Sequence, residues 1–356
     1  MKKINIFNKK YTELTGCIHN HTQYSFDSKA KLKTIVKAAE KNGLDYITIN
    51  DHRTCAVLDD QVINNNKDMM IIIGCEINDP DNNNHLLVFN SDKIIIGESA
   101  KTYIDYYSGT EAVTFIAHPL ENRASKRFRK YIWTDLKVDS FDGIEIWNYL
   151  SEWIGKLNPL LNGIWLILFP TLFVKKPLSK VMKYWDDLNK AGKRRSAIGS
   201  VDAHAGSVKK CGIKLSFLSH NALFKSIRTN VLIPEPSLIS QKNILTALKN
   251  GNSYIVNYKI GEPYNFYAGI ASEDGGNATF GQEIKYTKGM KYYFRLPKIA
   301  RVKLFKDGKK IASKLDEKGE FIIEQNGNYR LEIYRFGFGW IFTNNIYVTK
   351  EGSYEQ

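Results

Sequence analysis

The sequence predicts an α/β domain followed by a smaller all-β domain. Short runs of β-branched and apolar residues alternate with helix-like or loop segments between about residues 13 and 235. This alternation is typical of βαβ units around a parallel sheet, arranged either as a barrel or as a doubly wound sheet. After about Tyr258 the pattern changes, and tyrosine and phenylalanine alternate with polar residues between turn sequences. The second pattern indicates strands of hairpin length.

The strands predicted in the first domain are apolar runs bounded by polar or turn-forming residues. In chain order they are Thr12–Ile18, Leu44–Asn50, Met69–Glu76, His85–Phe89, Val113–Ala117, Gly143–Trp147 and Ser196–Val201, with Asn230–Ile233 as a further candidate. A helix is predicted over Leu32–Asn42, because apolar residues recur there at helical spacing and Gly43 can cap its end. A second helix, Gln241–Lys249, is predicted to close this domain.

The second domain is predicted to be a small antiparallel sandwich. Its strands are Tyr292–Leu296, Val302–Lys306, Gly319–Glu324, Tyr329–Tyr334 and Ile341–Val348. The predicted domains therefore span residues 1–257 and 258–356, and the second contains neither histidine nor cysteine. An apolar insertion occupies about residues 150–185 of the first domain. Its most apolar part, Leu160–Val174, is too short to span a bilayer. We expect a buried or lid-like insertion, while the lysines that follow leave an interfacial role open.

Net charge and cysteine content limit the class of protein. The chain has 51 Lys and Arg against 37 Asp and Glu, a net charge of +14 that favours small anionic substrates over neutral ones. No run of five like charges marks a nucleic-acid tail, so most of the excess is read as dispersed lysine and a nucleic-acid partner stays open.

Four widely spaced cysteines without a CxxC pair suggest reduced thiols. With no apolar signal-like start and no transmembrane segment, the expected location is cytoplasmic; the oligomeric state is not predicted.

Six of the seven histidines stand beside predicted strands, where metal ligands can converge. His19 and His21 are one residue apart and would project to the same side of an extended chain. Other candidate ligands come at strand ends: His52, Glu76, His118, Asp202 and His204. For any one of these residues a buried, hydrogen-bonded side chain is the commoner explanation. Together they favour a metal cluster, because pooled titratable groups are costly to bury unless paired or metal-bound. His220 lacks a partner motif and is predicted to be structural.

The ordered series resembles the polymerase-and-histidinol-phosphatase (PHP) superfamily of metal-dependent phosphoesterases. It runs HxH, Asp-His, an acid after Gly-Cys, a histidine, Ala-His-Pro and Asp-x-His, over about residues 13–255. The resemblance implies a distorted (β/α)7 barrel with a site for two or three divalent transition-metal ions, manganese, zinc or iron, at the C-terminal ends of its strands. The helix before residue 251 and the β domain after it resemble a subgroup that includes carbaryl hydrolase-type proteins.

By this resemblance the candidate ligands fall into three sets. The first ion would be held by His19, His21, Glu76 and Asp202, the second by Glu76 as a bridge with His118 and His85, and the third by Asp27, His52 and His204. Asp27 stands one position later than the acid of many relatives, so an ordinary loop residue is the alternative. For His85 the alternative is a histidine on a strand surface.

Further residues are predicted to support the chemistry. Asp51 would orient neighbouring imidazoles, and Arg53 and Arg123 would grip a phosphate with their planar guanidinium groups. The alternative for each arginine is an ordinary solvated surface residue. Together with His204, Asp51 and Arg53 are the residues predicted to be catalytic. Glu145, at the end of a predicted strand, either supports the site or pairs with a basic residue.

The predicted function is a metal-dependent phosphoesterase that hydrolyses a phosphomonoester or phosphodiester of a small or nucleotide-like substrate. Bridged ions would lower the pKa of bound water and supply hydroxide for in-line displacement. One alternative is that the same ions hydrolyse a carbamate, amide or ester bond, as the subgroup resemblance implies. The other is a catalytically silent barrel whose β domain binds a glycan or a protein, disfavoured because the ligand series is nearly complete.

Overall fold

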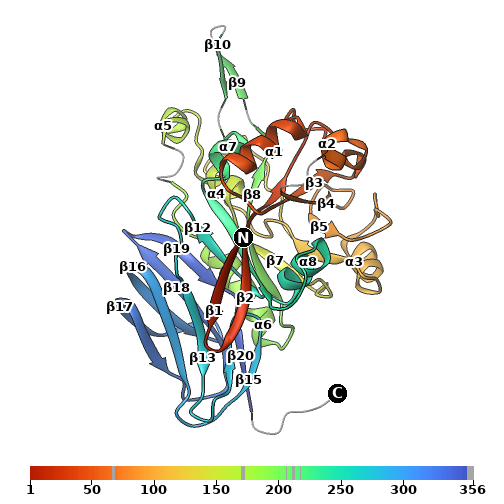
Figure 1. The fold of residues 1–356 in the computed structure, drawn as a ribbon. Helices are drawn as coiled ribbons and strands as arrows, with labels where there is room; N and C mark the ends of the chain where they lie inside the picture. Colours follow the sequence, from red (N-terminus) through yellow and green to blue (C-terminus); the bar gives the residue numbers. More distant parts are fainter. Residues whose placement is uncertain (66–68, 170–172, 206, 211–212, 217, 351–356) are drawn as a thin grey trace. The chain divides into compact units, whose positions relative to one another are not determined.

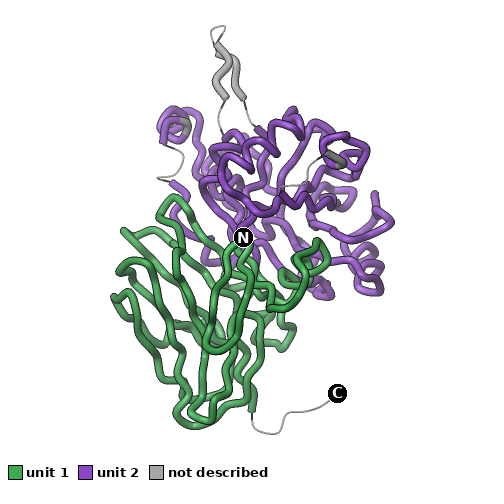
Figure 2. Tube along the Cα trace, viewed as in Figure 1, with its two compact units in different colours: residues 1–14, 182–197, 230–356 green, residues 15–181, 198–229 purple. Residues whose placement is uncertain are grey.

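The computed structural model describes residues 1–65, 69–169, 173–205, 207–210, 213–216 and 218–350 (Figure 1). The chain forms two compact units, each assembled from separate stretches of sequence (Figure 2). Unit 1 comprises Met1–Leu14, Met182–Ala197 and Asn230–Gln356, and unit 2 comprises Thr15–Val181 and Ile198–Thr229.

Unit 2 is built on a barrel of seven strands. They are β2 (Lys9–Asn20), β3 (Tyr46–His52), β4 (Met70–Ile77), β5 (Leu86–Phe89), β6 (Val113–Ile116), β7 (Gly143–Asn148) and β8 (Ser196–Ala203). Their pairings give the order β8-β2-β3-β4-β5-β6-β7, in which β5 alone runs antiparallel to its neighbours. The seven strands predicted from the sequence are therefore confirmed, and most are continuous apolar runs because both faces are buried.

Helices follow only some of the barrel strands. Between the strands lie α1 (Leu32–Lys41), the 3-10 helix η1 (Ala56–Asp59), α2 (Gln61–Asn65), α3 (Ala100–Ser108), α4 (Tyr149–Lys156), α5 (Gly163–Leu168) and α6 (Ser179–Lys190). After β8 come a short ladder of β9 (Ser207–Lys210) with β10 (Ile213–Ser216), then α7 (His220–Leu223). Residues 78–85 and 117–142, all described, contain no helix. An antiparallel neighbour needs no helical crossover, so β4 runs into β5 through a short loop and a regular (β/α)7 alternation is not observed.

Unit 1 is rich in antiparallel strands. Its elements are β1 (Lys2–Ile6), α8 (Gln241–Lys249), β12 (Ser253–Asn257), β13 (Tyr267–Ala271), β14 (Asn277–Ala278), β15 (Glu283–Lys285), β16 (Lys291–Lys306), β17 (Lys309–Ile322), β18 (Gly327–Arg335), β19 (Phe338–Thr343) and β20 (Ile346–Thr349). Strand β11 (Ile227–Pro234) begins in unit 2 and ends in unit 1. The helix predicted at Gln241–Lys249 is confirmed. The pair β15 and β20 is parallel, an exception to the expected antiparallel sandwich.

Two strands predicted in unit 1 are parts of one long strand, β16. Its pairing with β17 shifts in register between Arg295 and Ala300, around Pro297. Residues 291–295 pair with β13 and residues 301–306 pair with β18. A bulge bends a strand and increases its twist, so one strand can serve two ladders where two shorter strands were expected.

The division into units differs from the boundary predicted between residues 257 and 258. Strand β12 pairs with β19, with Tyr254 opposite Thr343. On α6, Asp186 forms an ion pair with Arg330 of β18. These contacts group both elements with the C-terminal strands in one unit, around a core that includes Tyr254, Tyr292 and Trp340.

The most apolar part of the insertion is largely exposed, so the buried alternative is wrong for it, while a lid-like role stays a prediction. Six of its large apolar side chains, between Leu160 and Phe169, are exposed, whereas Leu166 and Val174 are buried. Residues 170–172 of the predicted segment lie outside the described residues. Among the helices that the structure describes, none combines the length and the apolar character needed to cross a bilayer.

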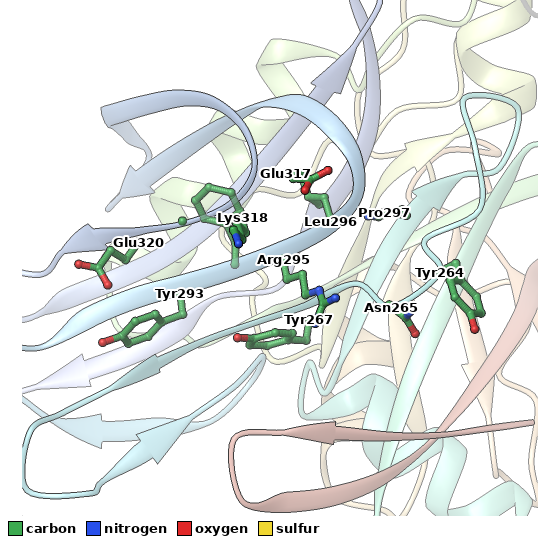
Figure 3. A pocket seen from close by; sticks show the side chains of 12 residues that line it. Tyr264, Asn265, Tyr267, Tyr293, Arg295, Leu296, Pro297, Glu317, Lys318 and Glu320 are labelled. Atoms are coloured by element: carbon green, nitrogen blue, oxygen red, sulfur yellow. The ribbon is translucent and has the colours of Figure 1, made fainter.

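Unit 1 also contains a cavity of about 820 Å³ on one face of β13, β16 and β17 (Figure 3). Tyr267, Arg295 and Lys318 are direct neighbours across these three strands. Tyr293 and Glu320 form the next pair along β16 and β17. The cavity therefore follows the surface of a sheet rather than the end of a barrel.

Candidate metal centre

The strand ends of the barrel bring the predicted ligands together. His52, the last residue of β3, lies directly opposite Glu76 on β4. His118 follows β6, and His204 follows β8. His85 immediately precedes β5, and because β5 is antiparallel its start lies at the same end as the carboxyl ends of its neighbours.

A break in the regular pairing of β2 aims His19 into the site. The register of β2 with β3 shifts between Cys17 and Asn20, and the register with β8 shifts between Ile18 and Asn20. His19 itself has a φ of 68°, and its backbone N–H donates to the Thr48 hydroxyl at 3.0 Å. The rings of His19 and His21 end with centroids 5.0 Å apart. The predicted convergence of this pair is therefore present, but a bulge achieves it rather than a regular strand.

Glu76 is the carboxylate around which the histidines gather, and it is almost completely buried. Its Oε1 lies 2.7 Å from His85 Nδ1 and 3.2 Å from His118 Nε2. Its Oε2 lies 3.1 Å from His19 Nε2, 3.4 Å from His21 Nε2 and 3.3 Å from His52 Nδ1. One carboxylate thus contacts five imidazoles through both oxygens, as a bridging ligand would.

Two aspartates complete the cluster. Asp202 Oδ1 lies 3.5 Å from His19 Nε2, 3.4 Å from His21 Nε2 and 3.4 Å from His204 Nδ1. Asp27 Oδ2 lies 3.1 Å from the Nε2 atoms of both His52 and His204. Asp27 therefore faces the histidines rather than solvent alone, although its side chain is 31% exposed.

The donor atoms fit divalent transition-metal ions. Ligand atoms of three groups lie close enough together to share an ion: His21, Asp27, His52 and His204; His19, His21 and Glu76; and His52, Glu76 and His85. Among the described residues, His21 Nε2 and His52 Nδ1 are buried without a hydrogen-bond partner. Two ligand atoms each about 2.1 Å from one tetrahedral ion lie about 3.4 Å apart. His21 Nε2 is 3.4 Å from both Glu76 and Asp202, a separation suited to shared coordination.

The electrostatics of the cluster show how strongly these groups interact. Burial disfavours the charged form of His118, but the hydrogen bond to Glu76 and the charge of Glu121 outweigh burial and raise its pKa to about 9. Burial likewise opposes the charging of His204, yet Asp27 and Asp202 raise its pKa to about 9. Burial and the neighbouring His204 instead lower the pKa of His21 to about 3. The cluster divides into imidazoles that hold a proton and an imidazole that stays neutral.

Two carboxylates outside the ligand cluster hold it in place. Glu145 Oε1 lies 2.7 Å from His19 Nδ1, and Glu145 Oε2 accepts the backbone N–H of His118 at 2.9 Å. Because a carboxylate only accepts, Glu145 favours a proton on Nδ1 of His19 and leaves Nε2 facing Glu76. Asp51 accepts the N–H and the hydroxyl of Thr22, each at 2.6 Å. It therefore anchors the chain just after His21, whereas we expected it to orient an imidazole directly.

The two arginines predicted to grip phosphate are placed differently. Arg53 is exposed, its guanidinium carbon lies 5.8 Å from the centre of the Phe26 ring, and it does not line the cavity beside the cluster. Arg123 lines that cavity, but its guanidinium donates to the Glu121 carboxylate at 2.5 Å and to two backbone carbonyls. The structure therefore brings the ligands together without directing either guanidinium freely into the site.

Sequence reasoning did not find several residues at the site. The cavity beside the cluster has a volume of about 320 Å³ and is lined by, among others, Phe26, Asn82, Glu121, Tyr131 and Ile154. Asn82 Oδ1 lies 3.1 Å from His85 Nε2, and Phe26 stacks on His52 with centroids 4.9 Å apart. Asn148 Nδ2 donates to both Glu145 and Asp202. Asn148 directly follows a predicted strand, a signal that could have identified it, whereas Asn82 and Glu121 lie in loops without a pattern.

His220 belongs to none of the ligand groups of the described residues, although it lies close enough to the cluster for His204 and the backbone of His21 and Ala203 to act on its ring. It is buried, and burial lowers its pKa to about 3. Its ring packs edge-on against Phe224, with centroids 5.7 Å apart. These contacts are those of a neutral core histidine.

A barrel whose strand ends carry a buried cluster of histidines and carboxylates defines a candidate metal-binding protein. Residues 18–126 match the PHP domain family, and this stretch includes His19, Glu76 and His118 but neither Asp202 nor His204. The match supports the PHP resemblance for that part of the chain, and the carbaryl hydrolase-type subgroup stays a prediction.

No curated protein sequence matches the chain significantly. The chain is similar to a crystal structure from Bifidobacterium adolescentis that is provisionally named a metal-dependent phosphoesterase, at 15% identity over 65% of this chain and 95% of that chain. The TM-score of that pair is 0.35, too low to constrain fold or chemistry.

Proposed function

We propose that this chain is a metal-dependent hydrolase that cleaves a phosphomonoester or phosphodiester of a small anionic substrate. The observation that carries the proposal is the contact of one buried carboxylate, Glu76, with five histidines. Burying such charged groups costs free energy unless they are paired or coordinate metal ions. A multinuclear metal centre for hydrolysis would be coordinated by them. The net charge of +14 is consistent with an anionic substrate.

The ligand sets proposed for the ions are those expected from the sequence. They are His19, His21, Glu76 and Asp202; Glu76, His85 and His118; and Asp27, His52 and His204. Bound divalent ions lower the pKa of water and polarise the oxygens of the substrate. Glu145 keeps His19 in one tautomer, and Asp51 fixes the backbone after His21.

The lining of the cavity favours a second candidate, hydrolysis of a carbamate, amide or ester bond. Among the lining residues that the structure describes, Arg123 is the one Lys or Arg, and Glu121 neutralises it. A phosphoesterase would gain from a cation free to bind the phosphate, as guanidinium groups do. A less charged substrate does not need a free cation in the cavity. The pairing of Arg123 with Glu121 therefore supports the second candidate.

Metal analysis followed by a substrate panel tests both candidates. Purified protein should contain two or three transition-metal ions per chain, measured by inductively coupled plasma mass spectrometry. Manganese-loaded enzyme should hydrolyse bis-p-nitrophenyl phosphate or p-nitrophenyl phosphate if the first proposal holds. Hydrolysis of p-nitrophenyl carbamates with phosphoesters untouched would select the second. Protein that binds neither manganese, zinc nor iron would refute both.

A further inference from the structure

The segment around α5 exposes an unusual amount of apolar surface. Six large side chains within ten residues are between 46% and 80% exposed: Leu160, Leu161, Ile164, Trp165, Leu168 and Phe169. Isolated exposed leucines are ordinary on soluble proteins, but contiguous apolar groups mark a surface that binds something. We call these six residues, which lie on and beside helix α5, the α5 patch.

The α5 patch is held in a definite orientation. Leu166, on the opposite side of α5, is completely buried, and its carbonyl accepts the indole N–H of Trp153 at 3.2 Å. The rings of Trp165 and Phe169 stack with centroids 5.9 Å apart. The Asn162 side-chain amide donates to the Lys156 carbonyl at 2.9 Å, which closes the loop before the helix. The exposed face is therefore set by packing on the other face.

The charges that flank the patch are all positive. Lys156 precedes it and Lys175 and Lys176 follow it, and all three are exposed. From residue 157 to residue 174 the sequence contains no charged side chain at all. Apolar side chains that include tryptophan, bordered by lysines, are the combination with which interfacial segments bind anionic membranes.

We infer that the α5 patch docks this protein onto a lipid bilayer that carries anionic headgroups. The leucines and Trp165 would enter the boundary between headgroups and acyl chains, with the flanking lysines at headgroup level. A second copy of the chain fits less well, because a stable dimer buries about 20 to 30 residues on each side. Six side chains on a helix of six residues fall well short of that.

Sedimentation with vesicles tests this inference on the full chain. The protein should bind phosphatidylcholine vesicles that contain phosphatidylglycerol, and binding should weaken as salt is raised. Leu161→Gln/Trp165→Gln should lower the partition coefficient at least tenfold. Leu238→Gln is the matched control, since Leu238 is 81% exposed in unit 1, and it should bind like the wild type. Lys176→Gln should weaken binding about fivefold, as expected for one basic residue near an anionic surface.

A second measurement does not depend on the stability of the polar variant. Vesicles with brominated acyl chains should quench part of the tryptophan fluorescence, and Trp165→Phe should remove that part while it retains binding. Wild-type protein that binds neither type of vesicle would overturn the inference. So would a wild-type dimer that Leu161→Gln/Trp165→Gln converts to a monomer in the ultracentrifuge, because the patch would then bind a second copy.

Discussion

The cavity on the sheet of unit 1 and the cavity beside the histidine cluster of unit 2 differ in the burial of the groups that line them. The cavity on the sheet of unit 1 measures about 820 Å³, and the one beside the histidine cluster of unit 2 about 320 Å³. Arg295 and Lys318 of the larger cavity are exposed. Glu76, His85 and His118 of the smaller cavity are buried and in mutual contact.

The difference teaches that convergence of buried titratable groups identifies a catalytic candidate better than volume does. Water solvates an exposed charge at little cost, so Arg295 or Lys318 needs no ligand to explain its presence. A buried carboxylate such as Glu76 needs partners, and its partners here are histidines. On this view, metal binding and hydrolysis belong to the smaller cavity alone.

The largest effect is expected from Glu76→Gln. This change removes the charge shared by five histidines, so metal content should fall and kcat/KM should drop by at least about 1000-fold, the loss of several kcal/mol of stabilisation. Metal analysis and steady-state kinetics measure both. Glu332→Gln is the matched control, because Glu332 is also a buried carboxylate but lies in unit 1, bonded to Arg330 and Tyr334. Full metal content in the Glu76 variant would contradict the proposed bridge.

A smaller effect is expected from Glu145→Gln. The amide keeps the size of the carboxylate but weakens the hold on His19 Nδ1, so metal affinity should fall by about 10-fold to 100-fold. Titration of the metal-free protein in competition with a chromophoric chelator gives the affinity. Unchanged affinity would mean that Glu145 only shapes the fold.

The affinity for divalent ions should depend on pH. In the metal-free protein the pKa values of His118 and His204 are raised to about 9, so both imidazoles carry a proton at pH 7. A metal ion binds the neutral imidazole, so affinity should be highest above pH 9 and fall about tenfold per pH unit below it for each proton displaced. The same chelator titration between pH 7 and pH 9 measures the slope. A flat profile would remove both histidines from the ligand sets.

The smallest effect is expected from Arg295→Ala in the larger cavity. Because this side chain is exposed and belongs to unit 1, metal content and kcat/KM should stay within about twofold of the wild type, as for most surface changes. A loss of activity as large as that of Glu145→Gln would show that the larger cavity takes part in the reaction.

The barrel was predictable from the sequence because its strands are buried apolar runs that end in polar residues. Met70–Ile77 and Gly143–Asn148 show this pattern plainly. Two features were not predictable. The antiparallel direction of β5 depends on its pairing with β4, the strand that contains Glu76. The continuity of β16 depends on a bulge near Pro297.

The ligand cluster was predictable to the extent that each ligand sits at a strand end. His19 and His52 follow apolar runs, so their convergence follows from strand geometry. The contacts of Asn82 and Glu121 come from loops whose paths no periodicity describes. The sequence predicts that the Arg123 guanidinium is free to bind phosphate. In the described structure it is bound instead by Glu121, two residues earlier.

Three of the candidate ligands share a backbone feature with a thermodynamic consequence. His19, His118 and Asp202 have φ values of 68°, 29° and 52°, in the region that residues other than glycine rarely adopt. Each such residue costs roughly 1–2 kcal/mol, so together they oppose folding by roughly 3–6 kcal/mol. That is a large part of the net stability of a typical domain. Other interactions of the folded chain must offset this cost, and an ion that binds the native site alone would add to them in proportion to its concentration.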